Sequence, residues 1–256
     1  MLTLALDTTT KAGSVAVMQG DRLLAVIRGE ATRSHGERLP EEIERAMRSA
    51  GVAPGELALL AVATGPGAFT GLRIGLATMQ GLAMVIGCPV VGVSALDALA
   101  ATVLDEADPN VLAVAPWMDA QRGEVFAAFY RCDQQSGGPP RAVGDPVVGA
   151  PDVLLTMLPA GFGGKTRFTG DGAWRYRAEI ARFTGGAART SEAPAALAPV
   201  IARIGQHLAA RGQAGPPHAL QPLYVRRPDA ELGRDRRTTP SPVPPSTPSL
   251  PSRDTE

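Results

Sequence analysis

The sequence has few of the residues that build catalytic and metal sites. Its 256 residues include only three histidines and two cysteines. The histidines are His35, His207 and His218, and no two stand four residues apart, so no His-x-x-x-His pair can bind a metal from one helix face. A Gly-x-Ser-x-Gly nucleophile turn is also missing from the sequence. We therefore expect neither a metal site nor a catalytic residue in this chain.

The sequence also has no net charge and few aromatic residues. Lys plus Arg and Asp plus Glu both number 25, and aromatic residues make up 4%. A neutral chain has no long-range field that would collect nucleic acid or an anionic membrane, so either role would need a partner or a local basic segment. Cys88 and Cys132 lack metal-ligand spacing, and we interpret them as buried thiols in a reducing compartment.

Targeting and membrane signals are not evident. The first residues, MLTLALDTTT, contain no basic segment and are typical of a strand, so we expect no signal peptide. Every long apolar stretch is interrupted by Gly, Pro or a charged residue. We therefore expect a cytoplasmic protein without membrane association.

Hydrophobic residues make up 45% of the chain, enough for buried cores. Apolar runs, helical spacing and the Gly20-Asp21 hairpin turn predict three strands followed by helix, strand, helix, strand and helix. This order is that of one half of the α/β actin/Hsp70-like (ASKHA) fold, which duplicates a βββαβα plan. The expected strands are 2–6, 14–18, 22–28, 59–63 and 89–93, and the expected helices are 39–50, 70–86 and one capped by Ser94.

Later segments are less regular, and the composition changes near the end. We expect a first domain at 1–105, a smaller α/β domain at 106–195 and a helix plus extension at 196–228 that returns to the first domain. A Pro-, Ser- and Thr-rich tail at 229–256 is expected to be disordered. The second domain is expected to hold strands at 111–115, 124–130 and 167–170, a loop at 136–140 and a helix at 174–183, and a further helix is expected at 199–210.

Two segments resemble phosphate-binding loops. Asp7, Thr8 and Thr9 end the first strand, where the corresponding hairpin of actin-like kinases holds nucleotide phosphates. We favour the interpretation that these residues satisfy the backbone of an ordinary turn, because the glycine that lets phosphate approach is missing. Gly164-Lys165-Thr166 matches the end of a Walker A motif, but the motif's first glycine is replaced by Pro159, so we interpret it as a chance match.

The segment GPGAFTGLRIGLATMQGLAM, residues 65–84, is the most distinctive. The Gly-Pro-Gly turn can direct the chain sharply off a strand, and Thr70 can cap the helix that follows. Gly71 and Gly75 each cost about 1 kcal/mol inside a helix, so they indicate a close approach by another element. Apolar residues cover more than one side of this helix, which fits either full burial within the chain or contact with a partner.

Several motifs together resemble the bacterial TsaB (YeaZ) family across about 1–230. They are LALDTTTKAGSVAV, SHGERLPEEIE, TGPGAFTGLRIGLATMQGLA, DAQRGEVFAAFY, TGDGA and LQPLYVRRPDA. Ala68 and Gly36 replace the family's usual Ser, and Gln121 replaces its frequent Ala or Arg. Members of this family are subunits of the machinery that makes threonylcarbamoyladenosine next to the tRNA anticodon.

The resemblance implies two actin-like lobes, the second degenerate, and a non-catalytic scaffold that activates a TsaD-like transferase. A TsaE-like ATPase joins that assembly, so ATP is used by the complex, and tRNA is met only through it. Alone, the chain is expected to form a homodimer. The helices at 39–50 and 70–86 would dock on the partner, the glycine-notched surface being shaped for that contact. The implied interface residues are Leu39, Ile43, Met47, Phe69, Thr70, Leu72, Arg73, Leu76 and Met79.

Three alternatives stay open at this point. The first is an actin-fold small-molecule kinase or ATPase that uses Asp7 and Thr8; if the chain is instead a scaffold, Asp7, Thr8 and Thr9 would be a remnant of a phosphate site. The second is a metallopeptidase, against which the missing histidine pair argues. The third concerns Arg226 to Arg237, a locally basic segment that would either contact tRNA or be a solvated part of the tail.

Overall fold

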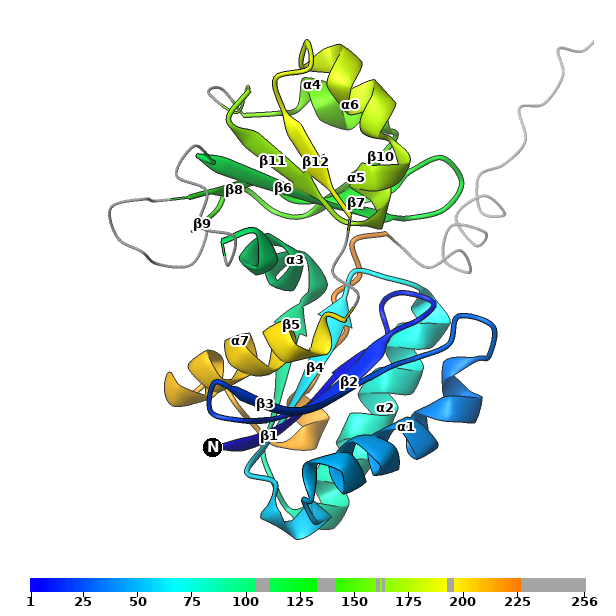
Figure 1. Ribbon diagram of the computed structural model, residues 1–256, viewed down its shortest axis with the longest axis vertical. Coiled ribbons are helices and arrows are strands. Elements are labelled where there is room, and N and C mark those ends of the chain that lie inside the picture. The colour runs from blue at the N-terminus through cyan, green and yellow to red at the C-terminus, as the bar shows by residue number, and fades with distance from the viewer. Residues whose placement is uncertain (105–110, 133–140, 160–161, 163, 193–195, 227–256) are drawn as a thin grey trace, which may run out of the picture. The chain divides into compact units, whose positions relative to one another are not determined.

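The computed structural model of the protein contains two β-sheets with helices on their faces (Figure 1). It describes residues 1–104, 111–132, 141–159, 162, 164–192 and 196–226, and residues 1–225 form one unit. The loop expected at 136–140 and the tail expected at 229–256 lie outside the described residues.

The first sheet has the strand order β3-β2-β1-β4-β5. The strands β1, β2 and β3 form an antiparallel meander, and β4 and β5 add to β1 in parallel. The central strands β1 and β4 are buried on both faces, as their nearly continuous apolar sequences predict. Their bounds are β1 (Leu2–Asp7), β2 (Ser14–Gln19), β3 (Arg22–Arg28), β4 (Leu59–Gly65) and β5 (Val90–Ser94).

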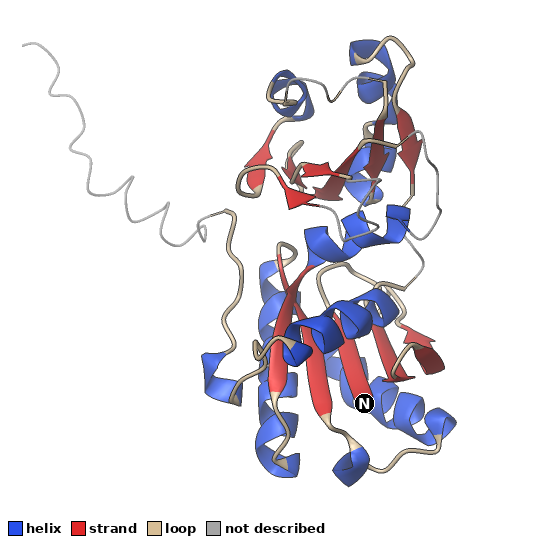
Figure 2. Ribbon diagram, turned by 90° about the vertical axis from the view of Figure 1, so that its left-hand side faces the viewer, coloured by secondary structure: helices blue, strands red, loops and turns tan. Residues whose placement is uncertain are grey.

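Helices cover both faces of the first sheet (Figure 2). Helices α1 (His35–Ala50) and α2 (Phe69–Ile86) pack on the face formed by large side chains such as Leu4 and Leu6. Helix α7 (Ala198–Ala210) packs on the opposite face, where alanines of β1, β2 and β4 allow a close approach. At Gly205 of α7 a Cβ would lie 2.7 Å from the Ala61 Cβ, so the alanine face requires glycine there.

The second sheet repeats the plan of the first with shorter strands. Its main order is β10-β7-β6-β11-β12, in which β10, β7 and β6 are antiparallel and β11 and β12 continue parallel to β6. Strands β8 (Tyr130–Arg131) and β9 (Arg141–Ala142) extend it beside β6. The main strands are β6 (Ala113–Asp119), β7 (Val125–Ala127), β10 (Val147–Gly149), β11 (Thr166–Thr169) and β12 (Arg189–Ser191).

The last helix of each lobe packs on the sheet of the other lobe. Helix α3 (Ala95–Leu104) follows β5 but contacts β6 and β11, whereas α7 follows β12 but contacts β1, β2 and β4. Both helices share one hydrophobic cluster with residues of both sheets. The remaining elements are α4 (Pro151–Thr156), α5 (Asp171–Arg175), α6 (Arg177–Phe183) and the short 3-10 turns η1 (Pro54–Glu56) and η2 (Pro217–Ala219). The chain has the predicted actin/Hsp70-like fold with two lobes.

Some predicted boundaries were wrong. Helix α1 begins at His35 rather than Leu39, because Ser34 donates its N–H and hydroxyl to the Glu37 carboxylate and starts the helix early, with Pro40 inside it. The strand predicted at 111–115 is β6, which begins two residues later and ends at Asp119. The helix predicted at 174–183 is two helices, α5 and α6, which meet at Tyr176.

Candidate docking surface

Helix α2 is covered on three sides, and the first sheet covers one of them. The side chains on this side are at most 5% exposed, and those of Leu76, Met79 and Ala83 lie in a cluster with β1 and β4. Leu72 belongs to the same side and is 1% exposed. This stripe fixes the helix on its own sheet and offers nothing to a partner.

The second side of α2 carries the two interior glycines. A Cβ at Gly75 would overlap the Thr8 hydroxyl, and one at Gly71 would overlap the Thr8 carbonyl oxygen. A Cβ at Gly71 would also lie 3.2 Å from the His35 ring. The expected close approach therefore exists, but the neighbour that fills the notch is the β1–β2 turn of the same chain. The expectation that these glycines form a notch for a partner was wrong.

The third side is flanked by the segment that follows α7. The Phe69 ring stacks on the Tyr224 ring with centroids 5.5 Å apart, and the Arg73 guanidinium lies 4.0 Å from the centre of the Phe69 ring. Further along the helix, the Gln80 amide donates to the carbonyl oxygens of Pro217 and Leu220 at 3.0 and 3.3 Å. Phe69 and Arg73 are thus surface residues held by this chain's own C-terminal segment.

The fourth side of α2 is open. We call Thr70, Ala77, Gly81, Met84 and Val85 the docking face; all five are exposed, and Met84 and Val85 are 75% and 85% exposed. The small residues stand in the first part of this face and the two large apolar side chains at its end. Small side chains let another helix approach closely, and exposed large apolar side chains provide area to bury.

Within the described residues, α2 is also the one helix whose length and mean hydropathy of 1.3 suit a membrane span. Its apolar stretch contains glycines and Arg73, the interruptions on which the sequence-based expectation relied. One such helix is weak evidence, because a helix packed in a lobe passes the same test, and α2 packs along β4.

The structure separates the predicted interface residues into two groups. Phe69, Thr70 and Arg73 are exposed, whereas the other six are at most 8% exposed and lie inside the first lobe. Their helical spacing reflects packing on the chain's own sheet. Thr70 does not cap α2, because the helix begins one residue earlier after Ala68, which has no capping side chain. The buried six are Leu39, Ile43, Met47, Leu72, Leu76 and Met79.

Sequence reasoning missed most of the docking face. Ala77, Gly81, Met84 and Val85 stand outside the glycine pair and the apolar stripe that the sequence singled out. The signal was present in the composition, because a helix that is apolar on more than one side has more apolar surface than one sheet can cover. Choosing the outward side required the positions of the β1–β2 turn and the C-terminal segment.

The β1–β2 turn is held by its own atoms and by α2. Oδ1 of Asp7 accepts hydrogen bonds from the Thr9 N–H at 2.9 Å and from the Thr9 hydroxyl at 2.6 Å. The Ala68 N–H donates to the Thr9 carbonyl oxygen at 3.2 Å, and a Cβ at Gly67 would lie 2.7 Å from Thr9. Asp7, Thr8 and Thr9 therefore lie together as predicted, at most 4% exposed, under the first turn of α2.

Carboxyl groups of both lobes interact near this turn. Burial raises the pKa of the Asp7 carboxyl, the two Thr9 hydrogen bonds oppose that change, and the Asp171 carboxylate of the second lobe adds to it. Burial likewise raises the pKa of Asp171, whose carboxylate accepts the Asp119 N–H at 3.0 Å. Asp119 in turn forms an ion pair with Arg175 at 2.8 Å. Thr8 and Thr9, which would face a phosphate, are at most 4% exposed.

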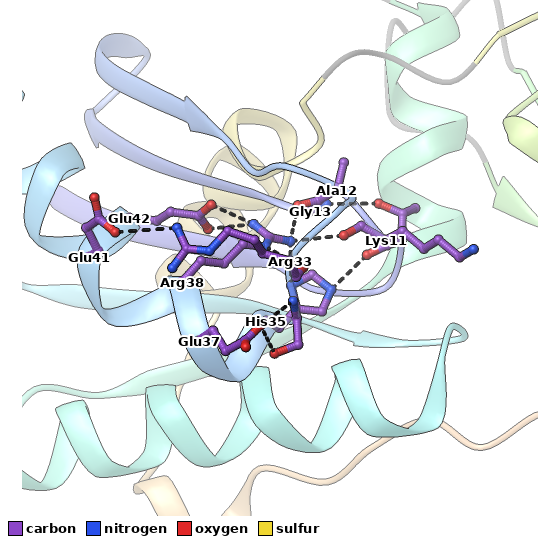
Figure 3. Close-up of polar contacts among 11 residues, drawn as sticks. Lys11, Ala12, Gly13, Arg33, His35, Glu37, Arg38, Glu41 and Glu42 are labelled. Carbon is purple, nitrogen blue, oxygen red and sulfur yellow. Dashed lines mark hydrogen bonds and ion pairs between the residues drawn. The ribbon is translucent and has the colours of Figure 1, made fainter.

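A buried network at the start of α1 holds the same turn from the other side (Figure 3). The Arg38 side chain is 2% exposed and binds both Glu42 carboxylate oxygens at 2.6 and 2.8 Å. Its second Nη donates to the carbonyl oxygens of Lys11, at 3.0 Å, and Ala12. Sequence reasoning missed this pair, although an Arg and a Glu four residues apart in SHGERLPEEIE were its signal.

His35 completes this network. Arg38 has only donors, so Nδ1 of His35 accepts its N–H at 2.8 Å, and Nε2 therefore carries the proton that is donated to the Thr10 carbonyl oxygen at 2.9 Å. Burial lowers the pKa of His35. His35 is the first residue of α1, and its bond to the Thr10 carbonyl oxygen holds the β1–β2 turn.

The remaining candidate groups are the possible metal ligands, the two cysteines and the tripeptide at 164–166. Among the described residues, no group of three or more His, Cys, Asp or Glu is arranged to hold a metal ion. Both cysteines are free thiols, Cys88 buried and Cys132 partly so. Gly164-Lys165-Thr166 leads into the start of β11, so the tripeptide does not follow a strand and open a helix as a phosphate loop does.

Comparisons with known proteins identify the family. Residues 26–165, more than half of the chain, match the family described as TsaD, tRNA N6-adenosine threonylcarbamoyltransferase. An uncharacterised protein of Mycobacterium tuberculosis H37Rv is 34% identical over 236 residues, which are 89% of this chain and 93% of the relative. The Escherichia coli K12 protein named tRNA threonylcarbamoyladenosine biosynthesis protein TsaB is 34% identical over 134 residues, which are 52% of this chain and 57% of that protein.

A solved structure resembles the whole described fold. YeaZ from Pseudomonas aeruginosa superposes with a TM-score of 0.71 at 29% identity, over 87% of this chain and 99% of that one. The sequence match spans little more than half the length of the E. coli TsaB protein. The family match, these relatives and the two-lobed fold lead to one conclusion: the chain belongs to the TsaB (YeaZ) family.

Proposed function

We propose that this chain is a non-catalytic subunit that docks on and activates a TsaD-like transferase, which modifies the tRNA adenosine next to the anticodon with a threonylcarbamoyl group. The observation that carries the proposal is the docking face of α2. Val85 and Met84 are large apolar side chains left in solvent on a helix whose other sides contact the first sheet, the β1–β2 turn and the C-terminal segment of the same chain. A contiguous exposed apolar face of this kind is characteristic of a protein interface.

The proposed role needs no chemistry from this chain. The Asp7 carboxylate and the Thr9 N–H and hydroxyl already bond to each other, and the Thr8 hydroxyl lies against α2. These residues do not fit a nucleotide phosphate, since they are at most 4% exposed and the Asp7 carboxyl interacts with the Asp171 carboxyl. We therefore assign ATP use to another component, a TsaE-like ATPase, and contact with tRNA to the assembled complex in the cytoplasm.

We also propose that the chain self-associates through the docking face. In the absence of the transferase, two copies of the chain can bury Met84 and Val85 against each other, so we expect a homodimer that dissociates when the partner is added. Dissociation of the homodimer by the partner would indicate that the second copy and the partner bind to the same surface. Sedimentation of the chain alone and with partner measures it directly.

The test compares two apolar-to-acidic substitutions. In Val85→Glu a charge replaces an apolar side chain in the docking face; Val153→Glu makes the same change at α4 of the second lobe, where Val153 is 52% exposed. We expect Val85→Glu to weaken binding to the TsaD homologue of the same organism at least about fivefold, because a buried interface anchor contributes more than about 1 kcal/mol. Val153→Glu should bind normally.

Activity supplies the second readout. With the TsaD and TsaE homologues, threonylcarbamoyl transfer to tRNA should require the wild-type chain and fall with Val85→Glu. Normal binding and transfer by Val85→Glu would contradict the proposed docking face. ATP turnover by the chain alone, lost in Asp7→Asn, would contradict the non-catalytic role.

A further inference from the structure

The chain after α7 returns along α2, and we call residues 215–225 the strap. It begins as a bridge in which Gly215 and Val90 exchange backbone hydrogen bonds at 2.9 and 3.0 Å at the edge of β5. In its middle, Leu220 is 9% exposed in the same cluster as Leu76, next to the carbonyl oxygens that accept from Gln80. It passes the carboxyl end of β4, where the Leu223 N–H donates to the Thr64 carbonyl oxygen at 2.8 Å.

The first half of α2 is intrinsically weak as a helix. Its N-cap, Ala68, has no side chain that can accept a hydrogen bond from the first turn. Gly71 and Gly75 each lower helix stability by about 1 kcal/mol relative to alanine. Something other than helix propensity must hold this half in place. The contact with Thr8 does so from the inner side only.

The strap supplies the outer contact at the same half. Tyr224 stacks on Phe69, and the Tyr224 hydroxyl accepts a hydrogen bond from Nε of Arg73 at 3.3 Å. Phe69 and Arg73 stand one helical turn apart, so Tyr224 ties the first turn of α2 to the second. All three side chains remain partly in solvent, and Phe69 and Tyr224 are each 40% exposed. The cluster is therefore a surface clamp and not a piece of the core.

The clamp lies beside the docking face. Counting along the helix, Phe69, Arg73 and Gln80 form one flank, and Thr70 and Ala77 stand on the adjacent open side. Gly65, at the exit of β4, has φ of 117°, and a Cβ there would lie 2.8 Å from the Leu223 carbonyl oxygen, so the turn before α2 is built to let the strap pass.

We infer that Tyr224 is a positioning residue: through its contacts with Phe69 and Arg73 the strap orders the first two turns of α2 and thereby sets the start of the docking face. This inference deepens the proposed function and rests on it for the partner. Its effect on α2 itself is a property of the free chain. The ordering of α2 by Tyr224 and the proposed function can therefore be contradicted separately.

Amide hydrogen exchange of the full-length free protein tests the clamp. Tyr224→Ala removes the ring and the hydroxyl, and exchange at Arg73–Leu76 should accelerate about three- to tenfold, the range expected for one aromatic pair. Tyr224→Phe keeps the stacked ring and should restore most of the protection. Trp174→Ala is the matched control, because Arg177 lies 4.7 Å from the ring centre of the 41% exposed Trp174 in the second lobe.

The control should leave exchange in α2 unchanged, and neither Tyr224 variant should alter exchange in β6. With the TsaD homologue, Tyr224→Ala should bind more weakly than wild type, and Tyr224→Phe should bind nearly as well as wild type. A merely structural loss would lower the protection of both lobes together.

Three results separate the inference from the proposed function. Unchanged exchange at Arg73–Leu76 in Tyr224→Ala would overturn the clamp even if Val85→Glu abolishes binding. Accelerated exchange with normal partner binding would also overturn the positioning role. If Val85→Glu binds normally while Tyr224→Ala loosens α2, the docking face has failed and the ordering of α2 by the strap stands.

Discussion

Thr8 places its side chain in the notch between two turns of α2, against the backbone of Gly75. The Thr8 hydroxyl is buried and has no hydrogen-bond partner among the described residues, so Thr8 contacts Gly75 by packing and not by a hydrogen bond. This contact joins the first turn of the chain to the helix that carries the docking face. The glycine that was expected to accommodate a partner is used within the lobe.

The notch predicts opposite effects for two glycine substitutions in one helix. Gly75→Ala should destabilise the protein by about 1–3 kcal/mol, because the new methyl group overlaps Thr8. Gly81→Ala meets nothing within 4 Å and should stabilise it by about 1 kcal/mol through helix propensity. Chemical denaturation measures both.

The double variant Thr8→Ala, Gly75→Ala checks the cause. Removing the hydroxyl and methyl of Thr8 makes room for the new Cβ, so the double variant should lose less stability than the sum of the single variants. Additive losses would mean that Gly75→Ala acts elsewhere.

Removing one partner of the buried Arg38–Glu42 ion pair in α1 should greatly lower the free energy of unfolding. Glu42→Gln leaves the Arg38 guanidinium buried without its counter-charge, which should cost about 3–5 kcal/mol. Glu44→Gln breaks the exposed Glu44–Arg48 pair at the same spacing and should cost less than about 1 kcal/mol. Similar losses in the two variants, measured by thermal unfolding, would contradict the assigned role of Arg38.

We expect the free energy of unfolding to depend on the protonation of His35 at mildly acidic pH. Its pKa is lowered in the folded state, first by burial and also by Arg38, while Asp7 and Glu42 oppose the change. Because the unfolded chain takes up the proton first, the contribution of His35 to stability is full above the ordinary histidine pKa of 6.5 and is lost as pH falls through the folded pKa. Protonation would also set an Nδ1 proton against the Arg38 donor.

The variant His35→Gln, whose side chain does not titrate, is the reference for this pH dependence. The difference in free energy of unfolding between wild type and His35→Gln should shrink as the pH is lowered from about 7.5 to about 5.5. A difference that stays constant or grows over this range would show that the folded pKa of His35 is not lowered.

Much of the fold follows from local sequence. Apolar runs and a hairpin turn located the strands of the first sheet, and the predicted family agrees with the comparisons. The predicted start of α1 was wrong because Pro40 lies inside the helix. The Ser34–Glu37 contact outweighs the cost of a proline at that position. The repeat of the strand plan in the second sheet is hidden in its sequence by strands of two or three residues.

The position of the docking face on α2 could not be predicted from the sequence. Leu76 and Val85 are both apolar residues of one helix, yet Leu76 is 5% and Val85 85% exposed. Which side is covered depends on Thr8, 67 positions before Gly75, and on Tyr224, 151 positions after Arg73. Helical periodicity identifies the stripe that packs on the sheet, but contacts this distant in sequence leave no local signal.

The most direct test of the docking face is the methyl NMR spectrum of the protein labelled at its methionine ε-methyl groups. Met84 on α2 and Met157 beside α4 are both well exposed, at 75% and 50%, and so serve as probe and control. On saturation with the TsaD homologue, the account predicts that the Met84 signal shifts or broadens while the Met157 signal keeps its position. A saturated complex in which Met84 is unchanged and Met157 responds would contradict it.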